Sequence, residues 1–154
     1  MKESVWDYPR PPVVKQCHRR ARVVLGGVTL ADSSRALRVL ETSQAPAIYF
    51  PPADVAMEHL REARERSLCE WKGIASYLDA EAGGRTSHAA AWTYHDPDPR
   101  YPELRDHVAF YPQRADECWL GDERVEPNHG DFYGGWITSE IEGPFKGGPG
   151  SRGW

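Results

Sequence analysis

The sequence predicts a mainly β protein, made of two small antiparallel sheets with one α-helix at about residues 54–67. Glycine and proline supply 14 and 13 of the 154 residues, well above their usual combined share of about 12%, which favours turns over a helix bundle. Short apolar runs recur about every 8–12 residues between turn-forming residues, a spacing typical of antiparallel sheets rather than parallel βαβ units.

The clearest single element is a β-hairpin at residues 20–31. Two β-branched runs flank Gly26-Gly27, and two glycines can adopt the positive φ angles that a two-residue hairpin turn requires. Further strands are predicted at 37–41, 48–50, 68–72, 74–79, 88–94 and 107–111, with a last hairpin-like segment at 118–125.

The helix is predicted where the hydrophobic period changes. Asp54 is a suitable N-cap residue, and Glu62 precedes Arg66 by four residues, the spacing of an ion pair along a helix. One face would carry the residues at i, i+4 and i+7 spacing, namely Ala53, Met57, Leu60 and Arg64. The opposite face is charged, as expected of a solvated helix surface.

The chain divides into three parts. Residues 1–20 form an extended, proline-rich lead-in, residues 21–125 form the β domain, and residues 126–154 form a tail rich in glycine and aromatic residues. A disordered tail normally lacks such rings. We therefore expect the tail to pack on the body of the protein or on a partner, with self-association through the tail as one form of the latter.

Composition excludes several classes of function. The net charge of −4 gives no reason to propose a nucleic-acid partner, because such partners need a basic face. The chain has no apolar run of about 18 residues and no signal-like apolar stretch near residue 1, so no membrane association and a cytoplasmic location are expected. The three cysteines, Cys17, Cys69 and Cys118, form no C-x-x-C pair, so neither a metal site nor a cofactor is predicted.

Six motifs in one order resemble the Domain of Unknown Function 427 family. They are Val23-Val-Leu-Gly-Gly-Val-Thr-Leu-Ala-Asp32, Val39-Leu-Glu41, Tyr49-Phe-Pro-Pro52, Cys69-Glu-Trp-Lys-Gly73, Ala91-Trp-Thr-Tyr94 and Val108-Ala-Phe-Tyr111. The tail from Gly130-Asp-Phe-Tyr-Gly-Gly-Trp136 is similar to the extension of actinobacterial members.

This resemblance implies a β-tent-like fold, in which two antiparallel sheets meet at an angle. Methionine sulfoxide reductase B and the thalidomide-binding domain of cereblon share that fold, and these relatives often carry paired-cysteine zinc sites that this chain lacks. The family has also carried a nucleotidyltransferase label, but the resemblance assigns no catalytic residue.

Aromatic and charged residues on several strands predict a binding cleft. In a strand, Trp92 and Tyr94 share one face, and Glu41 follows apolar neighbours, so it needs a partner. Lys72 directly precedes Gly73, and glycine in a strand often marks close approach by another backbone or a ligand. We expect a cleft between the two sheets that binds a small flat ligand with an anionic or carbonyl group toward Lys72. Its residues are Glu41, Tyr49, Trp71, Lys72, Trp92, Tyr94 and Tyr111.

Simpler interpretations stand beside this one. Aromatic residues on strands are mostly core, and a Glu41–Lys72 ion pair would explain both charges. A non-enzymatic interaction module that uses the aromatic tail is the alternative function.

Two enzymatic interpretations have weaker support. Cys69 is a weak candidate nucleophile, because a reactive thiolate needs a nearby cation such as Lys72, but no resolving cysteine is evident. Asp96-Pro-Asp98 has the spacing of a carboxylate pair for nucleotidyl transfer, but no phosphate-binding loop accompanies it. The histidines, His88, His95, His107 and His129 among them, show no zinc-ligand spacing.

Overall fold

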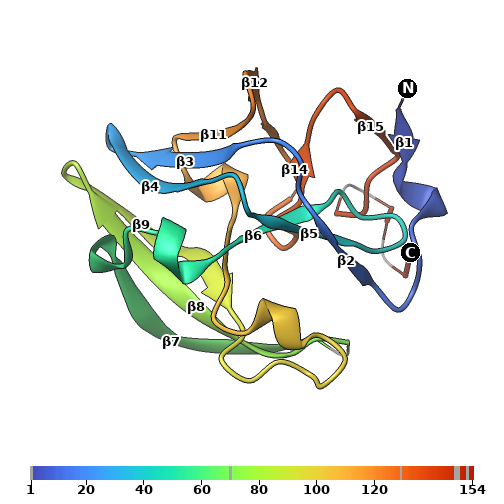
Figure 1. The fold of residues 1–154 in the computed structure, drawn as a ribbon, viewed down its shortest axis with the longest axis horizontal. Coiled ribbons are helices and arrows are strands. Elements are labelled where there is room, and N and C mark those ends of the chain that lie inside the picture. Colours follow the sequence, from blue (N-terminus) through green and yellow to red (C-terminus); the bar gives the residue numbers. More distant parts are fainter. Residues whose placement is uncertain (1, 70, 129, 148–149, 152) are drawn as a thin grey trace.

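The computed structural model describes residues 2–69, 71–128, 130–147, 150–151 and 153–154, and its architecture is mainly β (Figure 1). The larger of its two main sheets has seven strands, in the order β2-β5-β6-β10-β9-β8-β7, and all of its pairings are antiparallel. These strands are β2 (Val13–Gln16), β5 (Leu37–Leu40), β6 (Ala47–Phe50), β7 (Leu60–Cys69), β8 (Gly73–Ala82), β9 (Arg85–Thr93) and β10 (Val108–Phe110).

The smaller main sheet contains the predicted hairpin. Its order is β12-β11-β3-β4, with β3 (Ala21–Leu25), β4 (Val28–Ser33), β11 (Glu117–Leu120) and β12 (Glu123–Arg124). Gly26 and Gly27 join β3 to β4 with φ angles of 58° and 77°, as a two-residue turn between twisted strands requires. The expected hairpin-like segment at 118–125 is also present, as β11 and β12.

The predicted helix at residues 54–67 is wrong. Single 3₁₀ turns occupy Pro52–Asp54 (η2) and Met57–His59 (η3), and the strand β7 begins directly after them. The part of the chain that the structure describes contains no α-helix, and three further 3₁₀ turns are Val5–Asp7 (η1), Pro102–Leu104 (η4) and Pro112–Arg114 (η5). No helix in this part is long and apolar enough to span a bilayer.

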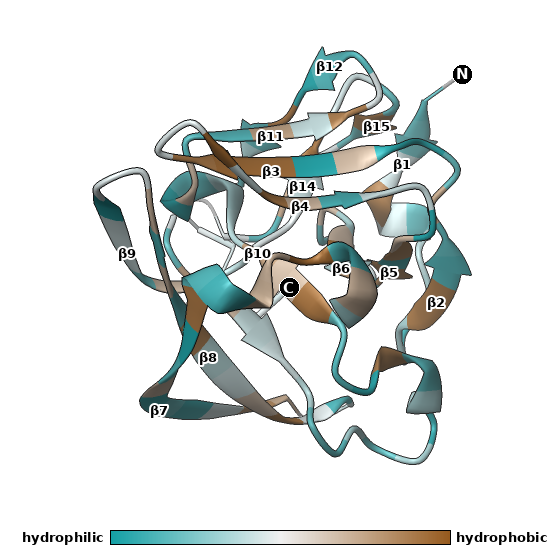
Figure 2. Ribbon diagram, turned by 60° about the vertical axis from the view of Figure 1, so that its left-hand side comes forward, coloured by the Kyte–Doolittle hydropathy of each residue, from teal (hydrophilic) through white to brown (hydrophobic). Residues whose placement is uncertain are grey.

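The predicted helix is replaced by an edge strand, β7. It pairs along its length with β8 at the edge of the larger sheet, so tertiary pairing overrides the helical spacing. Its arginines and glutamates, which make β7 largely teal in Figure 2, suit a solvated sheet edge as well as a helix surface. Glu62 and Arg66 do form an ion pair, 3.4 Å between Oε1 and Nη2, but across a register shift in the strand.

The seven-stranded sheet separates two apolar clusters. Strand β6 shows the alternation: Ile48 and Phe50 pack with residues of β3, β4 and β11, whereas Tyr49 packs with Trp92 and Tyr94 on the other face. The first cluster therefore lies between the two main sheets. The second lies on the face of the larger sheet that points away from the smaller one.

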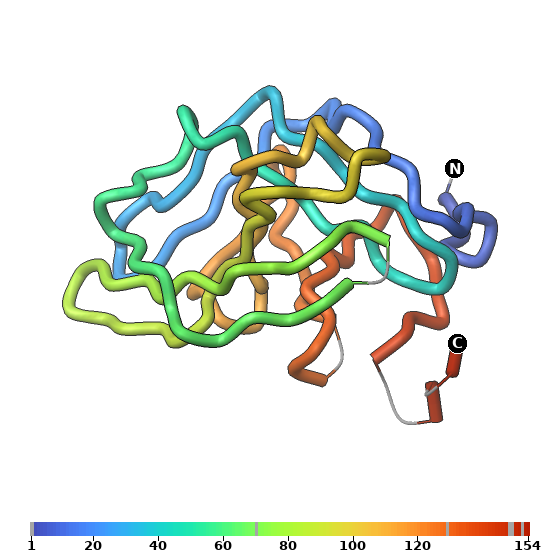
Figure 3. Tube along the Cα trace, turned by 90° about the horizontal axis from the view of Figure 1, so that it is seen from below, coloured from blue at the N-terminus to red at the C-terminus, as the bar shows by residue number. Residues whose placement is uncertain are grey.

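Short strands fasten both ends of the chain to the body. Glu3–Ser4 (β1) pairs in parallel with Ile141–Glu142 (β15), and Glu126–Pro127 (β13) pairs with Trp136–Ile137 (β14). Figures 1 and 3 both place the C-terminal segment beside the N-terminal one, where the rings of Trp6 and Trp154 meet at 5.1 Å. The lead-in also supplies β2, and the tail packs on its own chain.

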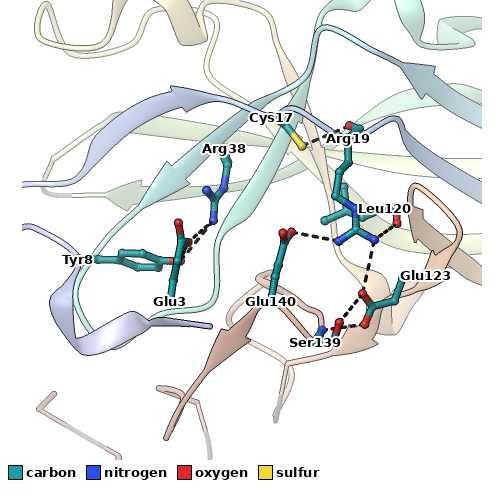
Figure 4. A network of polar contacts seen from close by, with 9 residues as sticks. All are labelled: Glu3, Tyr8, Cys17, Arg19, Arg38, Leu120, Glu123, Ser139 and Glu140. Atoms are coloured by element: carbon teal, nitrogen blue, oxygen red, sulfur yellow. Dashed lines mark hydrogen bonds and ion pairs between the residues drawn. The ribbon is translucent and has the colours of Figure 1, made fainter. Parts of the chain in front are cut away.

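Polar contacts hold these end segments in place (Figure 4). Arg19 lies 3.2 Å from Glu140 and 3.5 Å from Glu123, and Glu123 accepts hydrogen bonds from the Ser139 amide and hydroxyl at 2.7 and 2.9 Å. These contacts attach the tail to the four-stranded sheet.

Candidate functional site

A cavity of about 440 Å³ lies on the outer face of the seven-stranded sheet, the face turned away from the four-stranded sheet. The seven residues predicted to bind a ligand all line it, and so does Cys69. The expected location between the two main sheets is wrong, because Tyr49, Trp92 and Tyr94 point to the opposite side from the core between the sheets. The C-terminal segment forms the other wall, through Phe132–Gly135, Lys146 and Trp154.

Four aromatic rings form the floor of the cavity. The indole N–H of Trp92 donates a hydrogen bond of 3.0 Å to the hydroxyl oxygen of Tyr49, and both side chains are buried. Tyr49 and Tyr94 are stacked with their centroids 6.3 Å apart, and Trp92 contacts Tyr111 at 4.6 Å. The rings therefore pack on one another as a core does, and only part of each borders the cavity.

The phenols of this floor stay protonated at neutral pH. Burial raises the pKa of Tyr49, and the opposing effects of Lys72 and of the Trp92 hydrogen bond do not cancel it. Burial likewise raises the pKa of Tyr94, and the neighbouring Tyr49 and Cys69 add to that shift. The floor is accordingly neutral, and it offers hydroxyl groups rather than phenolates.

Lys72 lies in the turn between β7 and β8, so the predicted strand at 68–72 ends earlier, at Cys69. Gly73 has a φ of 112°, and a Cβ atom there would lie 3.4 Å from the Asp96 carbonyl oxygen. The Lys72 carbonyl accepts a 2.8 Å hydrogen bond from the Asp98 amide. The close approach expected at Gly73 is thus made by the 96–98 backbone. In a regular strand Glu70 would share a face with Lys72, but Glu70 lies outside the described residues.

The Lys72 ammonium is half-buried and charged. Burial acts to lower its pKa, but neighbouring groups that can carry a negative charge, Tyr49 and Cys69 first and then Glu41, raise the pKa overall. No carboxylate of the described residues forms an ion pair with it.

Glu41 follows β5, and its side chain is only 12% exposed. Its Oε2 lies 3.8 Å from Nε of Arg10, so the ion pair considered between Glu41 and Lys72 is replaced by one with Arg10. Arg10 also donates to the carbonyl oxygens of Thr42 and Trp154, at 2.9 and 3.1 Å.

Sequence reasoning missed two cations of this cavity, Arg10 and Lys146. Both come from end segments without a regular pattern of apolar residues, so no periodicity linked them to the strands.

The rim of the cavity is formed near the β7–β8 turn. The Arg100 guanidinium lies 5.5 Å from the centroid of the Trp71 ring, and its Nη2 donates to the Trp71 carbonyl at 3.3 Å. Leu68 lines the cavity although it is 78% exposed, which makes this side of the rim apolar.

Of the two enzymatic alternatives, the thiol lies in the cavity and the carboxylate pair has the less favourable geometry. All three cysteines are free, and Cys17 and Cys118 are buried whereas Cys69 is half-buried in the cavity. Asp96 lies 3.5 Å from Arg105, and Asp98 lies 2.9 Å from Arg100, so both carboxylates of the Asp-Pro-Asp loop face arginines. Within the described residues, no group of three or more His, Cys, Asp or Glu side chains is arranged to hold a metal ion. His129 lies outside the described residues.

A protein-family model matches most of the chain. It is described as Domain of unknown function (DUF427) and matches residues 13–121, and no curated protein matches the chain significantly. The matched range contains the sheet side of the cavity, with Lys72 and the aromatic floor. Arg10 and the wall from Phe132 onward lie outside it.

Proposed function

The chain belongs to the DUF427 family, and on that premise we propose that it is a small-molecule-binding protein whose site is the cavity on the outer face of the seven-stranded sheet. The ligand is small and planar, and it carries an anionic or carbonyl group that faces Lys72.

The observation that carries this proposal is the setting of Lys72. A half-buried charge without a counter-ion is costly among apolar neighbours, and an anionic ligand would reduce that cost. Aromatic rings and neutral hydroxyl groups line the same cavity as the ammonium. A cavity of about 440 Å³ also falls within the usual range of roughly 300–1,000 Å³ for ligand sites.

A fluorescence screen tests the proposal, because Trp71 and Trp92 border the cavity. Purified protein is titrated with a panel of metabolites and nucleotides while tryptophan emission is recorded. We expect a saturable change that Lys72→Met abolishes and Lys15→Met preserves, since Lys15 is an exposed lysine of β2. The proposal fails if no compound gives a saturable change, or if Lys72→Met responds as the wild type does.

An interaction module remains the second candidate, and one observation favours it. Phe132 of the tail is 63% exposed, although Trp136 of the same tail is buried within the chain. If the tail binds a partner, Phe132→Ser should abolish capture of that partner while the fold is retained. If the tail binds a second copy of the chain, the same variant should abolish the concentration dependence of sedimentation.

The proposal has three finer points, and the resemblance supports two of them. The two main sheets are arranged in a β-tent-like manner, and the tail is that of an actinobacterial-type member. The third point, a cytoplasmic location, is supported instead by the three free cysteines.

A further inference from the structure

We infer that the ligand of this cavity is a planar dianion, held between Lys72 on the sheet and Lys146 on the C-terminal segment. This inference rests on the proposed function, that the cavity binds a planar ligand with an anionic group.

The first argument is the balance of charge on the lining. Among the described lining side chains there are three cations, Arg10, Lys72 and Lys146, and one carboxylate, Glu41. Arg10 and Glu41 lie 3.8 Å apart and offset each other. Two ammonium groups are left, so a monoanion would neutralise only half of the remaining side-chain charge.

The second argument is that these two ammonium groups occupy different parts of the lining. Lys72 belongs to the turn between β7 and β8, where its carbonyl accepts a 2.8 Å hydrogen bond from the Asp98 amide. The Lys146 ammonium lies 5.3 Å from the centroid of the Tyr133 ring.

The backbone of Lys146 is held by Ser43 and Asn128. Its amide donates to the Ser43 carbonyl at 2.7 Å, and its carbonyl accepts from the Asn128 side chain at 2.8 Å. Lys72 and Lys146 therefore share none of these contacts, which favours a ligand with two separate anionic groups.

The third argument is that the tail wall is held in place before any ligand arrives. Arg114 lies 2.9 Å from the Asp131 carboxylate, and the Gln113 side chain donates to the Tyr133 carbonyl at 2.9 Å. Gly134 rests on the Trp92 ring. A preformed wall adds affinity because little ordering cost remains at binding. Since this wall lies outside residues 13–121, selectivity for a dianion is a property of the tail.

Four naphthalene compounds test the inference at low salt and pH 8. The neutral 2-naphthamide, the monoanion 2-naphthoate and two dianions, naphthalene-2,6-dicarboxylate and 2-naphthyl phosphate, share one planar ring system. The phosphate is doubly charged at this pH because its second pKa is about 6. Isothermal titration calorimetry measures binding of each to the wild type, Lys72→Met, Lys146→Met and the control Lys15→Met.

We expect at least one dianion to bind the wild type about tenfold or more tightly than the monoanion, a difference of roughly 1.4 kcal/mol. In Lys146→Met, the affinity for the dianion should fall to the affinity for the monoanion, and the affinity for the monoanion should not change. Lys72→Met should weaken the binding of every anion, and Lys15→Met should weaken the binding of none. A preference for the dicarboxylate or for the phosphate tells which kind of anionic group the site takes.

Two results overturn the inference while the proposed function stands. One is equal affinity of the wild type for the monoanion and both dianions. The other is a Lys146→Met variant that weakens monoanion and dianions by the same factor. Lack of binding by all four compounds to folded wild type would instead overturn the proposed function, and this inference with it. Circular dichroism checks the fold of Lys146→Met, whose anchoring hydrogen bonds come from the backbone.

Discussion

Gly134 lies directly on the indole ring of Trp92, and a Cβ atom on Gly134 would be 2.5 Å from Cη2 of that ring. The ring has little room to move, because Tyr49 and Tyr111 pack against it. We expect Gly134→Ala to lower the free energy of unfolding by about 1–3 kcal/mol, the usual cost of overpacking. Urea denaturation followed by circular dichroism measures this loss.

A double-mutant cycle with Trp92→Phe identifies the cause. The smaller ring leaves space beside residue 134, so Gly134→Ala should cost about 1 kcal/mol less in the Trp92→Phe background. The cycle also cancels the effect of the glycine replacement on the unfolded chain. Equal costs in the two backgrounds would show that the tail does not rest on the ring.

The second prediction concerns the hydroxyl group of Tyr49. Tyr49→Phe leaves the buried indole N–H of Trp92 without its acceptor, and a buried donor without a partner costs about 1–3 kcal/mol. Tyr77→Phe is the matched control, because its hydroxyl bonds to Ser67 at a partly exposed position. Urea denaturation should give a clearly larger loss for Tyr49→Phe. Similar losses for the two variants would contradict a buried Trp92–Tyr49 hydrogen bond.

The aromatic part of the site was predictable because it depends on a local rule. Side chains of a strand alternate between two faces, so Trp92 and Tyr94 had to share one. The same rule does not tell which face meets the second sheet, and the cavity was therefore expected on the wrong side. That choice depends on the packing of β3 and β11 against β6, contacts between residues far apart in the sequence.

The wrong helix at β7 and the two missed cations of the end segments have different physical causes. In β7, a charged edge strand and a solvated helix surface have the same composition, and only pairing with β8 distinguishes them. Arg10 and Lys146 reach the cavity through hydrogen bonds of irregular backbone, such as Lys146 to Ser43. No spacing of residue types encodes such contacts.

The third prediction is a pH dependence at His95. The ring lies 2.9 Å from the Asp106 carboxylate and 3.2 Å from that of Glu62. The hydrogen bond with Asp106 is the largest cause that raises the pKa of His95 above its usual 6.5. The folded state therefore binds the proton more tightly than the unfolded state, and the stabilisation is full below about pH 6.5. It is lost as the pH rises through the raised pKa of the folded state.

His95→Gln should accordingly destabilise the protein more at pH 6 than at pH 9. The groups are half-exposed, so we expect a difference within the roughly 0.2–1 kcal/mol of a solvated ion pair. Asp106→Asn is the informative second variant, since asparagine tolerates the left-handed φ of 58° at this position. An NMR titration should show a lower pKa for His95 in Asp106→Asn, and an unchanged pKa would refute the assignment.

The last prediction compares two adjacent glycines in the β8–β9 turn. Gly83 and Gly84 have φ angles of 56° and 77°, so alanine at either position adopts a left-handed conformation that costs about 1–2 kcal/mol. Of these two glycines, only Gly83 touches the turn between β3 and β4: a Cβ atom on Gly83 would overlap the carbonyl oxygen of Gly26. A Cβ atom on Gly84 would have nothing within 4 Å. The difference between the two variants therefore isolates the contact between the turns.

We expect Gly83→Ala to lower the free energy of unfolding by about 1–3 kcal/mol more than Gly84→Ala, the cost of overpacking added to the same backbone strain. Urea denaturation of both variants under one set of conditions gives this difference directly. Equal losses would mean that the two turns separate in solution. The two main sheets also meet at this contact. A large difference between the unfolding free energies of the two variants would show that packing of the β3–β4 turn on the β8–β9 turn stabilises the whole fold.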